Sequence, residues 1–322
     1  MDKTYFLGID IGGTKCAVIA GTEDMEILDR IQFDTETEKG PDQAISKLLE
    51  VSERIIHKFA SYKLVATGIS CGGPLDSKTG IIYSPPNLPG WDHIEIVKIF
   101  NEALGVPTFL QNDANACALA EWKFGAGKGT ENMIFLTFGT GLGAGLILNS
   151  RIYAGTNDLA GEIGHIRLAD EGPVAYGKAG SFEAFCSGSG IAELAKMIFR
   201  RKLKDGESLS LISKESEIEF ITTKDLAQAA DESDPTALEI FKISAEYLGK
   251  GLSILIDVIN PQMIVIGSVY ARNPGLFETI SQEVIQKEAL KPAWQVCDVV
   301  PAALGDQVGD YAALSVAMSG KD

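Results

Sequence analysis

The stretch that decides the fold is Tyr5-Phe-Leu-Gly-Ile-Asp-Ile-Gly-Gly-Thr-Lys-Cys-Ala-Val-Ile-Ala20, in which two apolar runs flank Asp10-Ile-Gly-Gly-Thr-Lys15. Apolar β-forming runs on both sides of a glycine pair predict a buried hairpin. Gly12 and Gly13 let backbone N–H groups approach a ligand, while Thr14 and Lys15 add a hydroxyl donor and a cation. This chemistry suits phosphate, although a plain tight turn explains the stretch equally well when it is taken alone.

Asp10 is the acidic member of this turn. A carboxylate repels phosphate unless a cation such as Mg²⁺ lies between them. Asp10 is therefore predicted as a metal-site residue.

The same arrangement, in which an apolar run, a glycine turn and a second apolar run follow one another, recurs later in the chain. It occupies Ile134-Phe-Leu-Thr-Phe-Gly-Thr-Gly-Leu-Gly-Ala-Gly-Leu-Ile-Leu148. In register, Asp10 falls on Thr137, Gly12 on Gly139 and Gly13 on Thr140. Two such loops about one domain length apart predict a duplicated architecture with a nucleotide clamped between the halves. The sequence has no G-x-x-x-x-G-K-[ST] motif and no G-x-G-x-x-G opening a helix after a strand.

Composition narrows the class of protein. The chain has 322 residues, 45% hydrophobic content and a net charge of −16, with a pI near 4.7. This length predicts two domains, and the acidity argues against a nucleic-acid surface. The N-terminal residues show no signal-peptide pattern and no apolar run approaches 18 residues, which predicts a soluble, cytoplasmic protein without membrane contact. Five scattered cysteines predict reduced thiols.

Periodicity predicts alternating strands and helices. After the hairpin, strands are expected over 26–35, 64–71, 106–110, 263–267 and 294–300. Helices are expected over 42–60, 93–104, 114–123, 190–204, 223–230, 235–259, 274–288 and 306–318, with 202–219 as a solvated connector. The proline-rich loop 85–91 either positions Asn87 and Trp91 for a ligand or is a plain connector.

Two further groups of polar residues are candidates for chemistry. Asn112-Asp113 follows a predicted strand and opens a helix, so it is a normal N-cap or, at the carboxyl end of a parallel strand, a base and a hydroxyl ligand. A lone histidine such as His165 is more often an ordinary core or surface residue. Glu162 and Glu183 bracket it in a glycine-rich segment, which supports a polyol site as the alternative.

The motifs Asp10-Ile-Gly-Gly-Thr-Lys15, Asn112-Asp113, Gly139-Thr-Gly-Leu-Gly143 and Glu162-x-Gly-His165 together resemble the ROK family of sugar kinases and repressors, within the actin-like ATPase superfamily. The resemblance covers essentially the whole chain. It implies an α/β fold of two actin-like, ribonuclease H-like domains with a ligand cleft between them. The implied domains are 1–121, joined by the C-terminal helix 306–322, and 122–305, and the family also implies a homodimer.

The resemblance implies roles for individual residues. Asp113 matches the catalytic base, which takes the proton of the sugar C6 hydroxyl as that oxygen attacks ATP. The implied substrate-binding residues are Gly73, Asn87, Asn112, Glu162, His165 and Glu183. The implied ATP-binding residues are Asp10, Gly12, Gly13, Thr14, Lys15, Thr140, Gly141 and Gly267, with Asp10 also holding Mg²⁺ through water.

The sequence departs from the family pattern at two places. Many relatives hold a structural zinc with the motif histidine and three cysteines, and those cysteine positions here are Val174, Tyr176 and Ser181. Cys186 alone cannot complete a tetrahedral site, so no zinc is predicted and the 170–180 loop must be held by packing. The usual Gly-Gly after the late strand is Gly267-Ser268, which weakens the assignment of adenine contacts.

The predicted function is ATP-dependent phosphorylation of the C6 hydroxyl of a hexose. Glucose is favoured because Asn87-Leu-Pro-Gly-Trp91 and Glu162-x-x-His165 resemble glucokinase members. Kinases for N-acetylmannosamine, N-acetylglucosamine, fructose or a β-glucoside are alternatives, and polyphosphate or another nucleotide stays open as the donor. A non-catalytic, sugar-responsive regulator is the alternative from another class. It is disfavoured because such repressors carry a helix-turn-helix segment ahead of the body, whereas here a strand is expected within about five residues of Met1.

Overall fold

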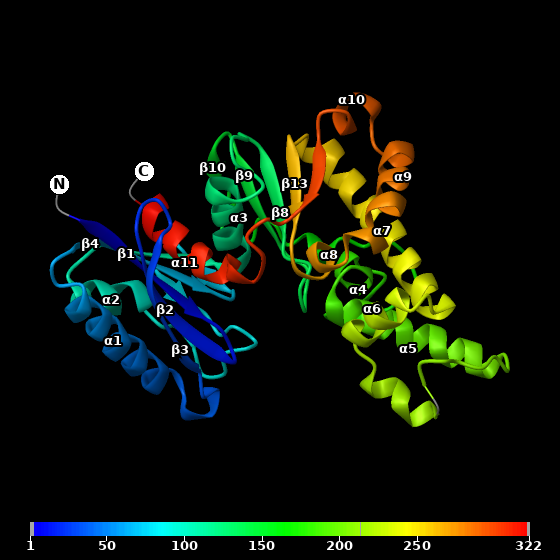
Figure 1. Cartoon of the computed structure of the whole chain (residues 1–322), viewed down its shortest axis with the longest axis horizontal. Coiled ribbons are helices and arrows are strands. Elements are labelled where there is room, and N and C mark those ends of the chain that lie inside the picture. Colours follow the sequence, from blue (N-terminus) through cyan, green and yellow to red (C-terminus); the bar gives the residue numbers. More distant parts are fainter. Residues whose placement is uncertain (1–2, 213, 321–322) are drawn as a thin grey trace. The chain divides into compact units, whose positions relative to one another are not determined.

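The computed structural model describes residues 3–212 and 214–320 (Figure 1). Contacts within the chain divide it into two compact units. Unit 1 runs up to Glu131, includes Gly145–Ala160 and resumes at Ala303, while unit 2 comprises Asn132–Ala144 and Gly161–Ala302. The domain limits expected from the sequence, 1–121 with 306–322 and 122–305, stay a prediction.

Strands and helices alternate along the chain, as the periodicity predicts. The strands are β1 (Thr4–Ile11), β2 (Lys15–Gly21), β3 (Ile27–Asp34), β4 (Lys63–Cys71), β5 (Leu75–Asp76), β6 (Ile81–Ile82), β7 (Thr108–Asn112), β8 (Met133–Leu136), β9 (Ala144–Leu148), β10 (Arg151–Ile152), β11 (Val174–Ala175), β12 (Lys178–Ala179), β13 (Met263–Ile266) and β14 (Asp298–Pro301). The helices are α1 (Pro41–Lys58), α2 (Ile96–Leu104), α3 (Asp113–Phe124), α4 (Phe182–Phe185), α5 (Gly188–Lys204), α6 (Thr223–Asp231), α7 (Pro235–Ile259), α8 (Ser268–Arg272), α9 (Glu278–Glu288), α10 (Lys291–Trp294) and α11 (Val308–Ser319). Short 3₁₀ helices occupy Thr37–Lys39, Ile163–His165, Glu215–Phe220, Pro274–Leu276 and Gly305–Gln307.

Both predicted strand–turn–strand stretches are confirmed. β1 and β2 are antiparallel partners on either side of the first glycine turn, and β8 and β9 flank the second. One sheet has the order β3-β2-β1-β4-β7, in which β1, β4 and β7 run parallel. The other has the order β10-β9-β8-β13-β14, in which β8, β13 and β14 run parallel.

The last predicted strand is partly wrong. Residues 291–294 are helical, with a proline in the first turn of α10, and pairing begins only at Asp298. The partner decides this length, because β13 offers only Met263–Ile266 for pairing. The predicted helix over 274–288 is a 3₁₀ turn followed by α9, and the one over 93–104 begins at Ile96.

The sheet of unit 1 is covered on both faces, as the alternation along β1 dictates. Tyr5, Leu7 and Ile9 face a core shared with α1 and α2. Phe6 faces the opposite way, into a core that α11 closes with Leu314 and neighbouring residues. The C-terminal helix therefore packs on β1, β4 and α3 (Figure 1).

Gly68 lets α11 lie directly on the sheet. A Cβ there would lie 2.2 Å from the backbone nitrogen of Ala317 and 2.4 Å from the carbonyl oxygen of Ala313. Because both atoms belong to the helix backbone, Gly68→Ala should displace α11 and lower the free energy of unfolding by about 1–3 kcal/mol. Urea unfolding measures the change. Gly275→Ala is the control, since among the described residues no heavy atom outside its own turn lies within 4 Å of its Cβ position. Equal midpoints for the two variants would contradict the account.

The aromatic core of unit 2 packs against one residue of the second glycine turn. Phe138, the second residue of that turn, is fully buried. Its ring packs edge-on against Phe277 at 5.3 Å, and Phe277 also contacts Phe241 and Tyr270. The turn is therefore attached to the aromatic core of α7, α8 and the segment before α9.

Every described helix is too short or too polar to span a bilayer.

Candidate active site

Three strand ends of unit 1 bring predicted site residues to one sheet edge. Ile11 pairs with Cys71, and Cys71 pairs with Asn112, in parallel register. The carboxyl ends of β1, β4 and β7 therefore meet, which is where parallel α/β sheets bind ligands. This edge carries Asp10 with the first glycine turn, the turn at Gly72, and Asn112-Asp113.

The first glycine turn is tightly closed. The Gly12 N–H donates to the Lys15 carbonyl at 3.0 Å, while Thr14 and Lys15 are exposed. A Cβ on Gly13 would lie 2.5 Å from the carbonyl oxygen of Asn87. Only glycine fits at residue 13, and Asn87 is placed directly beside the turn.

The loop after β4 approaches the same asparagine. The Cβ position of Gly72 is 3.3 Å from Oδ1 of Asn87, and Gly73, joined to Pro74 by a cis peptide bond, is exposed. Asn87 itself is exposed, so its amide can reach a ligand. The parallel expectation for Trp91 is wrong, because that side chain is fully buried in the core of unit 1.

Asp10 is a half-buried carboxylate among other acids. Burial first, and then the negative charges of Asp310 and Asp113, raise the pKa of Asp10 to about 7, while the Arg30 guanidinium lowers it. The Cβ position of Gly309 lies 3.3 Å from Oδ2 of Asp10, so a side chain there would crowd the carboxylate. A divalent cation held at Asp10 through water would offset this unfavourable charge.

Sequence reasoning missed the ion pair next to Asp10. Nε of Arg30 donates to both carboxylate oxygens of Asp310, at 2.9 and 2.7 Å. The two residues lie on β3 and α11, 280 positions apart, so no local pattern could have revealed the pair.

Asn112 and Asp113 start α3. Oδ1 of Asn112 accepts the N–H of Asn115 at 2.7 Å, so the N-cap reading is confirmed. Oδ1 of Asp113 accepts the N–H of Ala114 at 2.8 Å, and the Asp113 side chain is exposed. The helix start thus orients a carboxylate at the sheet edge, where it can accept a proton from a bound hydroxyl.

The second glycine turn, in unit 2, is held by hydrogen bonds across its base. The Thr137 N–H donates to the Gly143 carbonyl at 3.0 Å, and the Gly143 N–H donates to Oγ1 of Thr137 at 3.0 Å. The N–H of Gly188 donates to the Gly139 carbonyl at 2.7 Å, and Oγ of Ser189 donates to the Thr140 carbonyl at 2.7 Å. The start of α5 therefore holds the turn at Gly139 and at the predicted phosphate residue Thr140.

Glu183 joins the second turn to the predicted sugar-binding segment. Its Oε2 accepts the N–H of Leu142 at 2.8 Å. The same oxygen lies 2.8 Å from the Cβ position of Gly141, and the Glu183 Cβ lies 3.1 Å from that of Gly164. Glu162 and His165, which flank Gly164, are both exposed. Unit 2 thus gathers all three predicted polyol ligands next to its glycine turn.

His165 packs against Tyr176, one of the three residues at which the sequence lacks a cysteine. The two rings lie 5.5 Å apart, and Nζ of Lys178 donates to the His165 carbonyl at 2.6 Å. Cys186 is buried, and its thiol donates to the Ser244 carbonyl. Over residues 3–212 and 214–320, no group of three or more His, Cys, Asp or Glu side chains could hold a metal ion. The absence of zinc stays a prediction.

The 170–180 loop is ordered by protein contacts. It forms the β11–β12 hairpin, which pairs Val174 with Ala179. The Gly180 N–H donates to the Pro173 carbonyl at 3.0 Å, and Arg167 donates to the Ala179 carbonyl at 2.7 Å. Backbone pairing and one arginine fix the loop geometry.

Gly267 ends β13 beside the second turn. Its N–H donates to the Leu136 carbonyl at 2.9 Å, and Ser268 follows with a φ of 48°. The Cβ position of Gly139 lies 3.7 Å from the Ser268 hydroxyl oxygen. The predicted nucleotide residue therefore lies at the carboxyl edge of β8 and β13.

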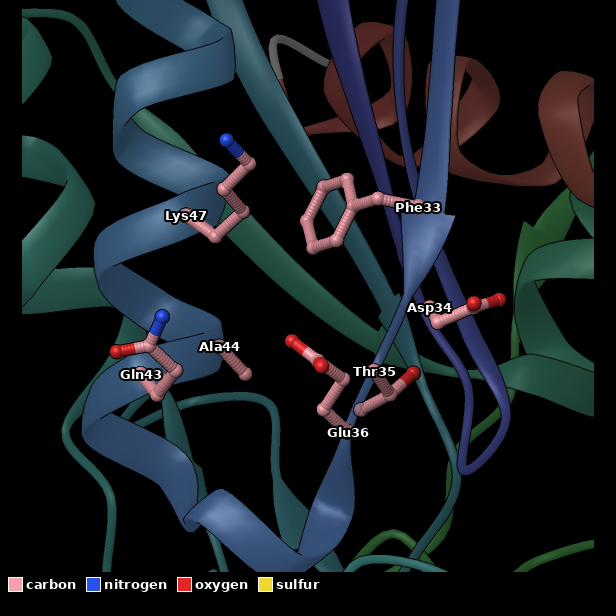
Figure 2. A pocket seen from close by; sticks show the side chains of 7 residues that line it. All are labelled: Phe33, Asp34, Thr35, Glu36, Gln43, Ala44 and Lys47. Atoms are coloured by element: carbon pink, nitrogen blue, oxygen red, sulfur yellow. The ribbon is translucent and has the colours of Figure 1, made fainter.

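A pocket of about 390 Å³ opens between the end of β3 and the start of α1 (Figure 2). It is lined by Phe33, Asp34, Thr35, Glu36, Gln43, Ala44 and Lys47. None of these residues was predicted from the sequence as part of the site. Thr35 connects this region to the first glycine turn through hydrogen bonds to its backbone.

A family model, related sequences and solved structures all match this chain over nearly its whole length. The model of the ROK family matches residues 6–319. A glucokinase of Halalkalibacterium halodurans is 33% identical over 314 residues, which are 96% of this chain and 93% of that protein. The solved structure of a ROK family glucokinase from Streptomyces griseus, in complex with glucose and AMPPNP, has a TM-score of 0.77 at 27% identity and covers 98% of this chain and 100% of its own.

The similarity extends to regulators. A xylose repressor of Bacillus spizizenii is 28% identical over 306 residues, which are 94% of this chain and 73% of that protein. The α/β class and actin-like fold predicted from the sequence are confirmed by the two five-stranded sheets and by the solved kinase structure.

Proposed function

Because the chain belongs to the ROK family, we propose that it is an ATP-dependent kinase that phosphorylates the C6 hydroxyl of a hexose, with glucose as the favoured substrate. The observation that carries the proposal is the meeting of Asp10, the first glycine turn and Asp113 at one edge of the unit 1 sheet. These are the parts that phosphoryl transfer needs, namely a phosphate cradle, a metal-associated acid and a base for the hydroxyl.

In the proposed reaction, Asp113 accepts the proton of the C6 hydroxyl as that oxygen attacks the γ-phosphorus of ATP. The new O–P bond forms while the bond from the γ-phosphorus to the bridging oxygen of ADP breaks. The protein contributes chiefly positioning and electrostatic stabilisation, because phosphoryl transfer requires no covalent enzyme intermediate.

The sugar would be held by carboxylate, imidazole and amide groups. Glu162, His165 and Glu183 lie next to the second turn in unit 2, and carboxylates make paired hydrogen bonds to vicinal hydroxyls. Asn112, Asn87 and Gly73 lie at the site edge of unit 1. Their contacts to the sugar are part of the proposal.

The phosphates would bind to the two turns. In unit 1, Gly13, Thr14 and Lys15 offer N–H groups, a hydroxyl and an ammonium, while Gly12, whose own N–H is bonded to the Lys15 carbonyl, leaves room for the ligand to approach. In unit 2, Thr140, Gly141 and Gly267 are the proposed phosphate-binding residues. Asp10 would hold Mg²⁺ through water, since one carboxylate and several waters satisfy the octahedral ion. Mg²⁺ supplies positive charge to the phosphates when bound.

The AMPPNP in the Streptomyces griseus enzyme supports ATP as the donor. Glucose is favoured because the relatives at 33% and 27% identity are glucokinases. N-acetylmannosamine, N-acetylglucosamine, fructose, a β-glucoside and, as donor, polyphosphate are the alternatives. A homodimer, a cytoplasmic location and the lack of nucleic-acid binding stay predictions.

The second candidate function is a sugar-responsive regulator without catalysis, which the similarity to the xylose repressor favours. The retention of both Asp10 and Asp113 favours the kinase, since a regulator needs only to bind the sugar.

The test is ADP release from Mg·ATP with purified protein across glucose, mannose, fructose, N-acetylglucosamine, N-acetylmannosamine and cellobiose. Sugar-dependent turnover supports the kinase and names the substrate. A sugar that raises the unfolding temperature without any turnover would overturn the kinase proposal and favour the regulator.

Glu183 should affect sugar and nucleotide together, because one oxygen holds Leu142 in the second turn. Glu183→Ala leaves the Leu142 N–H without that acceptor, and loss of a charge-assisted bond of roughly 1.5–3 kcal/mol should lower kcat/KM by about 10–100-fold. Glu183→Gln can still accept the Leu142 N–H, so its kcat/KM for ATP should fall less than its kcat/KM for the sugar. Separate KM values for the two substrates check this, and a loss confined to the sugar in both variants would contradict the role in the turn.

A further inference from the structure

Thr35 holds the first glycine turn from a position that no motif of the sequence marks. It follows β3 and is only 2% exposed. Its hydroxyl donates to the Gly12 carbonyl at 2.6 Å, and its backbone N–H donates to the Thr14 carbonyl at 2.9 Å. The Cys16 thiol lies 3.4 Å from the same hydroxyl oxygen. Figure 2 shows Thr35 between Asp34 and Glu36 at the end of the strand.

These two bonds fix the direction of the peptide planes in the turn. In a trans peptide the C=O and the following N–H point in opposite directions. Because the carbonyls of Gly12 and Thr14 point to Thr35, the N–H groups of Gly13 and Lys15 point away from it. Those N–H groups are ones that a phosphate cradle uses.

We propose that Thr35 is a positioning residue for nucleotide phosphate, which acts by turning the N–H groups of Gly13 and Lys15 toward the ligand. The proposal rests on the proposed kinase function. Asn87 packs against Gly13, so the turn has a second support that is independent of Thr35. The residue touches the turn and not the phosphate, and its effect should therefore appear in ATP binding and leave sugar binding unchanged.

Three variants separate positioning from simple stability. Thr35→Val keeps the shape and the backbone bond to Thr14 but removes the hydroxyl, whereas Thr35→Ser keeps the hydroxyl. Thr67→Val is the matched control on β4 of the same sheet. Thr67 is fully buried, and its hydroxyl has no hydrogen-bond partner among the residues the structure describes.

The expected result is a rise of about tenfold in the KM for Mg·ATP in Thr35→Val, as follows from losing one buried hydrogen bond in the cradle. The KM for the sugar should stay at the wild-type value, Thr35→Ser should restore the ATP value, and Thr67→Val should behave as wild type. An unchanged KM for ATP in a folded Thr35→Val protein would overturn the proposal, and so would equal rises for ATP and sugar.

Hydrogen exchange of backbone amides tests the same role without any kinase activity. Peptides that cover residues 12–16 should exchange about fivefold faster in Thr35→Val than in wild type or Thr67→Val. Unchanged exchange would overturn the proposal even if the enzyme is a kinase. If the Thr35→Val peptides exchange faster but the wild-type protein phosphorylates no sugar, Thr35 still supports the turn and the proposed kinase function is wrong.

Discussion

Asp113→Asn should lower sugar-dependent ADP release by about 10²–10⁴-fold, the range for loss of a general base. The asparagine keeps the size of the side chain and can accept the Ala114 N–H as Asp113 does, but it cannot take up the C6 proton. Because the substitution leaves the hydrogen-bonding groups of the turns in place, kcat should carry the loss and the KM for ATP should change little.

Asp42→Asn is the matched control for Asp113→Asn. Asp42 is an exposed acid in the first turn of α1, as Asp113 is in the first turn of α3. Both substitutions remove one negative charge near a helix N-terminus, so their effects on unfolding should be similar and small. Turnover by Asp113→Asn within a few-fold of Asp42→Asn would remove Asp113 from the role of base.

Asp10→Asn should make the protein without ligand more stable at pH 8 and at the same time nearly inactive. The native pKa of Asp10 is raised to about 7 from the ordinary value of 3.8, first by burial and then by Asp310 and Asp113. This difference in pKa corresponds to about 4 kcal/mol, since each pKa unit is worth about 1.4 kcal/mol. Ionised Asp10 therefore destabilises the empty site, which a bound cation would relieve.

The pH dependence has a definite sign. Between pH 4 and pH 7 the native protein binds more protons at this carboxyl than the unfolded chain does, so the wild-type free energy of unfolding falls as the pH rises. At pH 4 the carboxyl is largely protonated in the native state, and Asp10→Asn should differ little from wild type. The advantage of the variant should grow to its full size above pH 7.

Urea unfolding in EDTA at pH 4.5, 6 and 8 measures this difference. Asp29→Asn is the control with the opposite sign, because the hydrogen bond from the Lys58 ammonium lowers the pKa of Asp29 in the native state. That variant should lose a little stability above pH 4. If Asp10→Asn were less stable than wild type at pH 8, the carboxylate would be compensated within the protein, and the case for a cation at Asp10 would fail.

The sequence predicted the elements whose signal is local. The two glycine turns and their flanking strands are confirmed. They were predictable because the apolar runs and the spacing of the glycines lie within a few consecutive residues. The position of Asn112 at a strand end and helix start is confirmed for the same reason. The long helix over 235–259 has the predicted limits, since Asp234 caps it and Pro235 starts it.

The sequence did not predict features that depend on distant partners. The pair of Arg30 with Asp310 and the hydrogen bond of Thr35 to Gly12 join elements brought together only by the sheet. Trp91 lies four residues after Asn87 in the same loop, but its side chain is buried in the core of unit 1. The limits of β14 followed from the length of β13, which no property of residues 294–300 could show.

Glu183 shows how a correctly chosen residue can have a wider role than its motif indicates. The resemblance implied only a sugar ligand, whereas the structure places one of its oxygens on the backbone of the second glycine turn. Thr35 does the equivalent for the first turn through a hydroxyl. Each glycine turn is thus held by a side chain from outside its own motif, as expected where flexible glycines must present N–H groups in one fixed arrangement.

The central claim is transfer of phosphate from ATP to the C6 oxygen of a hexose, and the most direct test is the identity of the product. Glucose labelled with ¹³C at C6 is incubated with Mg·ATP and the protein, and the mixture is followed by ³¹P and ¹³C NMR. The account predicts a phosphomonoester whose phosphorus couples to C6, formed in equal amount to ADP and absent with Asp113→Asn. ADP formed without this signal, or phosphate found on another oxygen of glucose, would contradict it.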